Sequence, residues 1–378
     1  MSDTTAQLRA AGVSLWLDDL SRELLAGGTL SELIRDHDVV GVTSNPTIFA
    51  SALAEGDRYD GQLHDLARDG VSVEAAVAAV TTHDVRDAAD LLRPVWEATH
   101  GRDGLVSLEV DPGLADDTPG TLAAAQRLWA TVDRPNLMIK IPATPQGLPA
   151  VAQALAAGIS VNVTLIFALD RYREVIEAFL VGLEGARAAG RDLSTLSSVA
   201  SFFVSRVDTE VDRRLDALGT PAAQALRGKA ALANARLAYQ IFEQSREGSR
   251  WAVLAAAGAR PQRPLWASTG VKDPAYPDTL YVSGLVAPDT VNTVPLGTLR
   301  AFIDHGEIRG ATVRDGYLQS ARVLTDLAEV GVDLTEVTST LEEEGVRKFR
   351  RSWAELTSAV ADQLHLASST RIAEEAQQ

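Results

Sequence analysis

Short, almost entirely apolar segments recur along the chain, and each is followed by a stretch whose apolar residues have helical spacing. Such segments are typical of strands in a parallel sheet, because helices cover both faces of that sheet and no face needs polar residues. The expected strands are VSLWLD (13–18), VVGVT (39–43), LVSLEV (105–110), LMIKI (137–141), ISVNVT (159–164), SVASFF (198–203), PLWAS (264–268) and TLYVS (279–283). Eight strands that alternate with helices predict the α/β class, as a (β/α)8 TIM barrel with additional helices. A doubly wound open sheet is the alternative.

The connections between these strands predict one elaborated barrel. The 378 residues contain no internal repeat, low-complexity tract or Pro/Gly-rich linker, so we expect a single domain over residues 1–378. Extra helices are expected in residues 44–104, 206–258 and 296–378. After residue 290 the pattern is helical to the end, and the charged run LEEEGVRKFRRSW (341–353) is typical of a solvated helix.

Composition excludes several classes of function. The formal net charge is −16 and the sequence pI is about 4.8, so nucleic acids and anionic membranes are not expected partners. The absence of cysteine excludes disulfides, thiolate nucleophiles and cysteine-ligated metals. The N-terminus does not resemble a signal peptide, and no apolar run approaches the roughly 18 residues that span a bilayer. We therefore expect a cytoplasmic protein.

The motifs that usually bind cofactors are also missing. The six histidines show no metal-ligand spacing, and no GxGxxG run opens a helix after a strand. Gly228-Lys229 lacks the upstream glycine and the following Ser or Thr of a P-loop, and no GxSxG run is present. The sequence therefore predicts neither a metal nor a cofactor.

Three charged residues stand at or near the ends of expected strands, where a barrel carries its reactive groups. Lys140 is the single charge in LMIKI; burial disfavours an ammonium ion, and a neutral amine that meets a carbonyl group forms a Schiff base. In the alternative interpretation, the aliphatic part of the Lys140 side chain packs against the protein while its ammonium group reaches water. Glu109 is an acid–base candidate or the partner of Lys140 in a structural ion pair. Asp18 is an acid–base candidate or the cap of the next helix.

Polar residues at other strand ends extend this candidate site. Asn45 precedes a proline in GVTSNP, where it either binds a ligand or caps a helix. Asn162 and Thr164 lie two positions apart on one expected strand, so they share a face that points into an eight-stranded barrel.

Hydroxyl groups and cations follow two neighbouring expected strands. Ser201 and Arg206 belong to the first of these groups, and Ser268, Gly270 and Lys272 to the second. Because the carboxyl ends of parallel strands meet at one end of a barrel, these residues predict a cradle for a phosphate group.

Taken together and in this order, the motifs resemble those of the transaldolase family. GVTSNPTIF (41–49) is close to the family's first signature, and NLMIKIPATPQGLPA (136–150) is similar to the run around its Schiff-base lysine. The acidic strand LVSLEVDP (105–112) lies between them. The resemblance runs from LWLDDLS (15–21) to TLYVSGLVAPDTVNTVP (279–295), and the length is similar to that of the longer bacterial subgroup. It implies an enzyme that moves a dihydroxyacetone unit between sugar phosphates.

The resemblance also implies a role for each catalytic candidate. Lys140 would be the Schiff-base nucleophile, and Asp18 would take the proton from the C4 hydroxyl as the C3–C4 bond breaks. Glu109 and Thr164 would position and activate the water that is used in forming and hydrolysing the imine.

The resemblance also implies which residues bind the substrate, with one difference from the family's pattern. The donor's hydroxyls would be held by Asn45 and Asn162, and its phosphate by Ser201 and Arg206. Family members often have an arginine shortly after the serine that corresponds to Ser268, whereas this chain has Lys272 four positions later. Lys272 or backbone N–H groups would therefore supply the second phosphate ligand, without arginine's bidentate geometry.

Two other functions remain open from the sequence. A fructose 6-phosphate aldolase on the same barrel would release free dihydroxyacetone, and those enzymes tend to carry Gln and Tyr where this chain has Glu109 and Phe203. A noncatalytic barrel scaffold is the other alternative. For a transferase, the expected donors are fructose 6-phosphate or sedoheptulose 7-phosphate, and the acceptors erythrose 4-phosphate or glyceraldehyde 3-phosphate. Either a monomer or a homodimer is compatible with the sequence.

Overall fold

Eight parallel strands close into a barrel in the computed structural model, which describes residues 4–55 and 57–375. The strands are β1 (Val13–Leu17), β2 (Val39–Thr43), β3 (Leu105–Glu109), β4 (Leu137–Pro142), β5 (Val161–Ile166), β6 (Ser198–Phe203), β7 (Arg263–Ala267) and β8 (Thr290–Val294). Each strand pairs with the next, and β8 closes the barrel against β1 from Val13↔Thr290 to Leu17↔Val294. The predicted (β/α)8 barrel is confirmed, and the open sheet is wrong.

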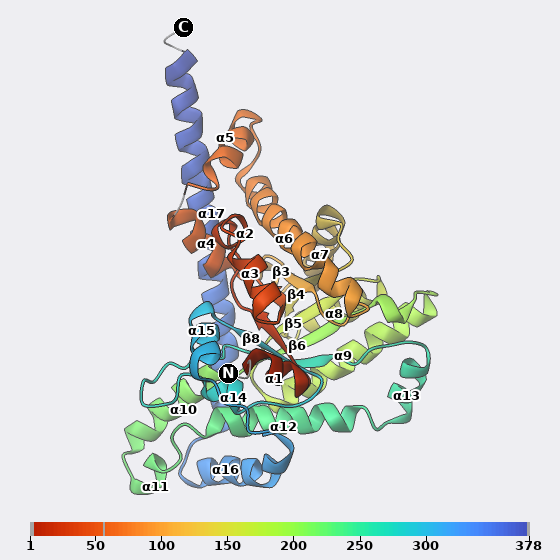
Figure 1. The fold of residues 1–378 in the computed structure, drawn as a ribbon, viewed down its shortest axis with the longest axis vertical. Coiled ribbons are helices and arrows are strands. Elements are labelled where there is room, and N and C mark those ends of the chain that lie inside the picture. Colours follow the sequence, from red (N-terminus) through yellow and green to blue (C-terminus); the bar gives the residue numbers. More distant parts are fainter. Residues whose placement is uncertain (1–3, 56, 376–378) are drawn as a thin grey trace.

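Helices surround the barrel and extend beyond it (Figure 1). Before β6 they are α1 (Thr4–Ala10), α2 (Arg22–Ala26), α3 (Thr29–Asp36), α4 (Pro46–Glu55), α5 (Asp60–Arg68), α6 (Val73–Ala98), α7 (Thr118–Val132), α8 (Gly147–Ala156) and α9 (Leu169–Ala188). After β6 they are α10 (Ser205–Leu218), α11 (Pro221–Gln224), α12 (Ala230–Ser245), α13 (Ser249–Ala256), α14 (Leu280–Ser283), α15 (Leu296–His305), α16 (Tyr317–Glu329) and α17 (Leu334–Glu375). Short 3-10 turns occur at Pro112–Leu114, Leu193–Thr195 and Arg314–Gly316.

The expected eighth strand was placed wrongly. Residues 280–283 form the short helix α14, in which Tyr281 and Val282 are both buried although they are neighbours in sequence. The true strand is β8, eleven residues after the expected one, in a region predicted to be helical. Its central Asn292 is fully buried, and polar residues inside a barrel make a strand look unlike the apolar segments that served as the guide. Five residues are also too few for periodicity to separate helix from strand.

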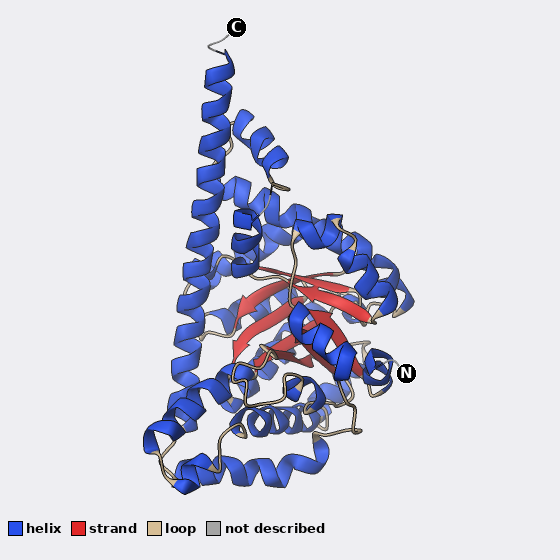
Figure 2. Ribbon diagram, turned by 60° about the vertical axis from the view of Figure 1, so that its left-hand side comes forward, coloured by secondary structure: helices blue, strands red, loops and turns tan. Residues whose placement is uncertain are grey.

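The C-terminal helix α17 is not the solvated helix that its charge suggested. Leu341, Gly345, Phe349 and Ser352 are buried at helical spacing within the charged run, so one face of the helix packs on the protein. This face contacts α4, α5, α6 and α10. In Figure 2 the long helix passes the end of the barrel toward which the strands point. The exposed positions of this run are mostly charged, which explains why the sequence resembled a solvated helix.

Candidate active site

A cleft of about 280 Å³ lies at the carboxyl end of the strands. It is lined by residues from the ends of seven strands and from α4, α10 and α17. Eight of the ten predicted site residues line it, namely Asp18, Asn45, Lys140, Thr164, Ser201, Arg206, Ser268 and Lys272. The remaining two, Glu109 and Asn162, are buried beside it and are absent from its wall. The barrel thus brings together groups that are up to 254 positions apart in the chain.

Lys140 lies near the end of β4 with its side chain turned into the barrel, and the residue is 5% exposed. Its Nζ donates to the carbonyl oxygen of Ser44 at 3.2 Å, just beyond β2. The nearest carboxylate oxygen, Oε2 of Glu109 on the neighbouring strand, is 3.8 Å away, beyond hydrogen-bond distance. The amine therefore stays at the cleft wall and does not snorkel to bulk water.

Glu109 is buried without a hydrogen bond to any described residue, since both of its carboxyl oxygens lack a partner in this part of the chain. Burial raises the pKa of Glu109 to about 7. The charge of Lys140 lowers the pKa and that of Asp18 raises it, so the ion pair does not offset the desolvation. The Oγ1 atom of Thr164 is likewise buried and unpartnered among the described residues. A carboxyl group with such a pKa exchanges protons near neutral pH.

Asp18 is fixed by barrel closure and not by helix capping. Its backbone N–H donates to the carbonyl of Val294 at 2.8 Å, and its Oδ1 accepts from Oγ1 of Thr43 at 2.9 Å. The Thr43 hydroxyl is also 2.9 Å from that of Thr293. Ser21 caps the following helix, so the capping alternative for Asp18 is wrong.

Asp19, the neighbour of Asp18, also does not cap a helix. Burial, followed by the charge of Asp18, raises the pKa of Asp19 to about 6. Thr43 and Thr293, which line the cleft, were not among the predicted site residues. The signal for Thr293 was hidden because its strand was read as helix.

The two asparagines differ in what their side chains do. Oδ1 of Asn45 accepts from the backbone N–H of Ile48 at 3.1 Å, so Asn45 caps the start of α4 and also lines the cleft. Asn162 is fully buried; its Nδ2 donates to Oγ of Ser107 at 3.0 Å, and its Oδ1 accepts from Oγ of Ser201 at 2.7 Å. Asn162 therefore holds the hydroxyl of Ser201 in place at the cleft wall.

Polar side chains gather at the ends of β6 and β7, where the sequence predicts a phosphate cradle. Arg206, in the first turn of α10, lies with its guanidinium carbon 5.0 Å from the centroid of the Phe203 ring. Burial lowers the pKa of Arg206, although Asp18 and Glu344 oppose the effect. Ser268 has a left-handed backbone (φ 56°) and its hydroxyl is 3.0 Å from that of Ser205.

Two lining residues come from α17 and were not among the predicted site residues. Phe349 is 5% exposed, and Nζ of Lys140 lies 5.6 Å from the centroid of its ring. Lys348 precedes it at the mouth of the cleft. Both belong to the run that the sequence suggested was solvated, and their helix lies about 200 positions from Lys140 in the chain. An aromatic residue within a highly charged helical run was the one available signal.

Comparison with known proteins agrees with this geometry. The family model described as Transaldolase/Fructose-6-phosphate aldolase matches residues 15–360. The chain belongs to this family. A protein of Thermobifida fusca named Transaldolase is 66% identical over 365 residues, which cover 96% of this chain and 99% of that protein. A Transaldolase of Parafrankia sp. is 59% identical, with 98% and 100% covered, and Transaldolase 1 of Streptomyces avermitilis is 60% identical, with 95% of each covered.

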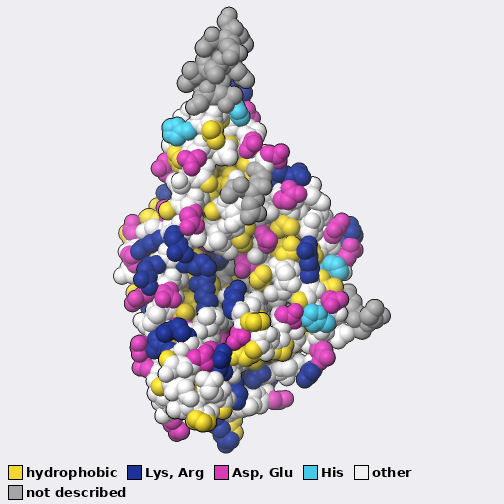
Figure 3. All heavy atoms as spheres, turned by 90° about the vertical axis from the view of Figure 1, so that its left-hand side faces the viewer, with side chains coloured by type: hydrophobic (Ala, Val, Ile, Leu, Met, Phe, Trp, Pro, Cys, Tyr) yellow, Lys and Arg dark blue, Asp and Glu magenta, His cyan; other side chains and the backbone are white. Residues whose placement is uncertain are grey.

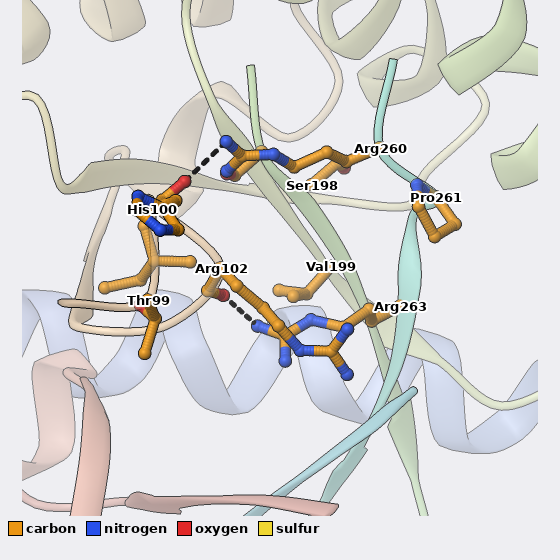
Figure 4. Close-up of a pocket in the computed structure, with 10 residues that line it drawn as sticks. Thr99, His100, Arg102, Ser198, Val199, Arg260, Pro261 and Arg263 are labelled. Carbon is orange, nitrogen blue, oxygen red and sulfur yellow. Dashed lines mark hydrogen bonds between the residues drawn. The ribbon is translucent and has the colours of Figure 1, made fainter. Parts of the chain in front are cut away.

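A second cavity, of about 230 Å³, lies at the opposite end of the barrel, among residues that precede or begin the strands. Three arginines line it (Figure 4). Arg263 donates to the hydroxyl of Ser14 at 2.7 Å, to the carboxylate of Asp103 at 3.0 Å and to the carbonyl of Arg102 at 2.6 Å. Arg260 donates to the carbonyl of His100 at 2.5 Å. Arg102 is itself paired with an aspartate, so this is a structural network whose cations already have acceptors.

Within residues 4–55 and 57–375, no group of three or more His, Cys, Asp or Glu side chains is placed to hold a metal ion. A search of the same part of the chain finds no helix that is long and apolar enough to cross a membrane.

Proposed function

We propose that this chain is a transaldolase, which transfers a dihydroxyacetone unit from a ketose phosphate to an aldose phosphate through a Schiff base on Lys140. One observation carries the proposal: the buried amine of Lys140, at the wall of a cleft that also contains Asp18, lies 3.8 Å from the buried carboxyl group of Glu109, which has no hydrogen bond to any described residue. Family membership and the relatives named Transaldolase support it.

The first step is condensation of Lys140 with the ketone of the donor. The amine nitrogen adds to C2, and the C2 oxygen leaves as water after it receives two protons. Glu109 is close enough to Lys140 to serve this exchange, and its pKa of about 7 lets it both donate and accept at neutral pH. Thr164 lines the cleft, and its hydroxyl, which has no hydrogen bond within the described part of the chain, would orient the water.

The second step breaks the C3–C4 bond. Asp18 removes the proton of the C4 hydroxyl, the C4 oxygen becomes the carbonyl of the departing aldose phosphate, and the bond's electron pair moves into the protonated imine. The result is an enamine on Lys140. The hydrogen bond from Thr43 orients the Asp18 carboxylate for this task.

The third step is the reverse of the second with a new aldehyde. The enamine carbon attacks the acceptor carbonyl, the new C4 oxygen takes its proton from Asp18, and water hydrolyses the imine. Because the three-carbon donor fragment stays covalently bound to Lys140 until the acceptor arrives, ping-pong kinetics are expected. No metal is required, since the protonated imine is the electron sink.

Two residues favour transfer over release of free dihydroxyacetone. At these two positions the chain has Glu109 and Phe203, the residues that are typical of the transferases, whereas the aldolases tend to have Gln and Tyr there. The ring of Phe203 packs 5.1 Å from that of Phe167 and beside Arg206, so it presents no hydroxyl group to orient water in the cleft.

Sugar phosphates are the proposed substrates, and the cations at the ends of β6 and β7 are the proposed phosphate ligands. Cytoplasmic location and the choice between monomer and homodimer stay predictions of the sequence.

The test is fructose 6-phosphate turnover with and without erythrose 4-phosphate, followed by glyceraldehyde 3-phosphate release. We expect sustained release only with the acceptor, and borohydride trapping of one dihydroxyacetone unit on the wild type but not on Lys140→Met. Equal release without the acceptor, with free dihydroxyacetone accumulating, would make the protein an aldolase. Wild-type-like turnover by Lys140→Met would refute the Schiff-base assignment.

A further inference from the structure

Helix α17 crosses the mouth of the cleft in a fixed position. Glu342 pairs with Arg171 of α9 at 3.3 Å, and the hydroxyl of Ser352 is 2.7 Å from that of Thr47 on α4. Between these anchors, Gly345 lies so close to β5 that a Cβ atom there would be 2.9 Å from the side chain of Leu165. The segment that carries Lys348 is therefore held at both ends.

Three cations from separate elements meet at this mouth. Arg206 comes from α10, Lys272 from the loop after β7 and Lys348 from α17, and all three line the same cleft. Nζ of Lys272 turns back toward the end of β7, within 3.9 Å of the position that a Cβ of Gly270 would take. The three cations thus border one space from three sides.

No salt bridge or hydrogen bond joins any of these three cations to another described residue, and of Arg206 and Lys348 only Arg206 feels carboxylate charges, those of Asp18 and Glu344. Lys348 is exposed at the mouth of the cleft; partial burial and then the charges of Arg206, Lys272 and Arg351 lower its pKa, and no carboxylate counters that effect. Like charges destabilise one another unless an anion lies between them. The arginines at the opposite cavity differ in this respect, because each already donates to a protein oxygen.

The face of the molecule that carries α17 also presents positive charge. Figure 3 looks onto this face and shows Lys and Arg side chains gathered at its middle. In a chain with a formal net charge of −16, such a local concentration would attract an anion that the global charge repels.

We propose that Lys348 binds the phosphate group of the sugar substrate together with Arg206 and Lys272, so that the C-terminal helix completes the phosphate site. This assignment rests on the proposed function. It also accounts for the arginine that the loop after Ser268 lacks, because the missing positive charge comes from a distant helix. Lys348 would then select phosphorylated sugars over neutral ones.

The variants to compare are Lys348→Met, which keeps the apolar stem and removes the charge, and Lys348→Arg, which restores the charge. Arg347→Met is the matched control, since its side chain is 70% exposed on the same helix and does not line the cleft. We measure selectivity as the ratio of kcat/KM for fructose 6-phosphate to kcat/KM for fructose. We expect Lys348→Met to lower this ratio roughly 10- to 100-fold, which is the usual effect of losing one charge-assisted hydrogen bond. Lys348→Arg should recover most of this loss, and Arg347→Met should match the wild type.

Binding of inorganic phosphate, measured by calorimetry, gives a second readout that needs no turnover. We expect Lys348→Met to weaken it by a similar factor. An unchanged phosphate affinity, or an equal loss of activity toward fructose and fructose 6-phosphate, would overturn the assignment. If the wild type binds phosphate through Lys348 but transfers no dihydroxyacetone, the proposed function fails while the phosphate site stands.

Discussion

Replacing Glu109 with glutamine separates the cost of burying this carboxyl group from its use in catalysis. Burial raises the pKa of Glu109 from 4.5 to about 7. Between these pH values, the folded protein keeps a proton that the unfolded chain has released. The stabilising contribution of the raised pKa is therefore complete below about pH 4.5 and is lost as the pH rises through 7.

The size of the effect follows from this window. Each pH unit corresponds to about 1.4 kcal/mol of free energy. From about pH 5 to about pH 8 the wild type should lose about 3 kcal/mol of unfolding free energy relative to Glu109→Gln, which cannot titrate. Urea unfolding of both proteins at the two pH values measures this difference. Glu343→Gln, an exposed change on α17, is the control and should show no such trend.

The same variant tests the catalytic role. If ionised Glu109 activates water, wild-type imine turnover should rise through pH 7, and Glu109→Gln should lose this rise together with roughly 10²- to 10⁴-fold in rate. A stability difference that is the same at both pH values would refute the raised pKa. A retained rise in turnover near pH 7 would refute the catalytic role.

Two further predictions concern Asp18 and the opposite end of the barrel. Asp18→Asn should still form the borohydride-trappable imine but cleave the C3–C4 bond roughly 10²- to 10⁴-fold more slowly, because the general base is lost; rapid cleavage would assign the base to another group. Arg263→Met should cost about 3–5 kcal/mol in denaturant unfolding, because the carboxylate of Asp103 remains buried without its partner. Turnover per folded molecule should not change in Arg263→Met, and lower turnover with unchanged stability would contradict the structural role of that network.

Seven of the eight strands could be located from the sequence because strands covered on both faces consist of apolar residues. The eighth could not, because β8 carries Asn292 inside the barrel and follows a short apolar run that forms α14. Most of the candidate site could be predicted for a related reason. The carboxyl ends of all eight strands meet at one end of a barrel, so a polar residue at a strand end is already placed.

The sequence by itself determined the barrel, the position of Lys140 at the carboxyl end of β4, and its neighbours on adjacent strands. These follow from local patterns, because the period of a strand and the direction of a parallel sheet fix where each side chain points. The tertiary structure alone decided that Asn162 supports Ser201, that Thr43 and Thr293 hold Asp18 in place, and that Lys348 and Phe349 close the cleft. Contacts between separate segments of the chain leave no periodic signal in a single sequence. A helix that is charged on one face reads as solvated until the surface that buries its other face is known.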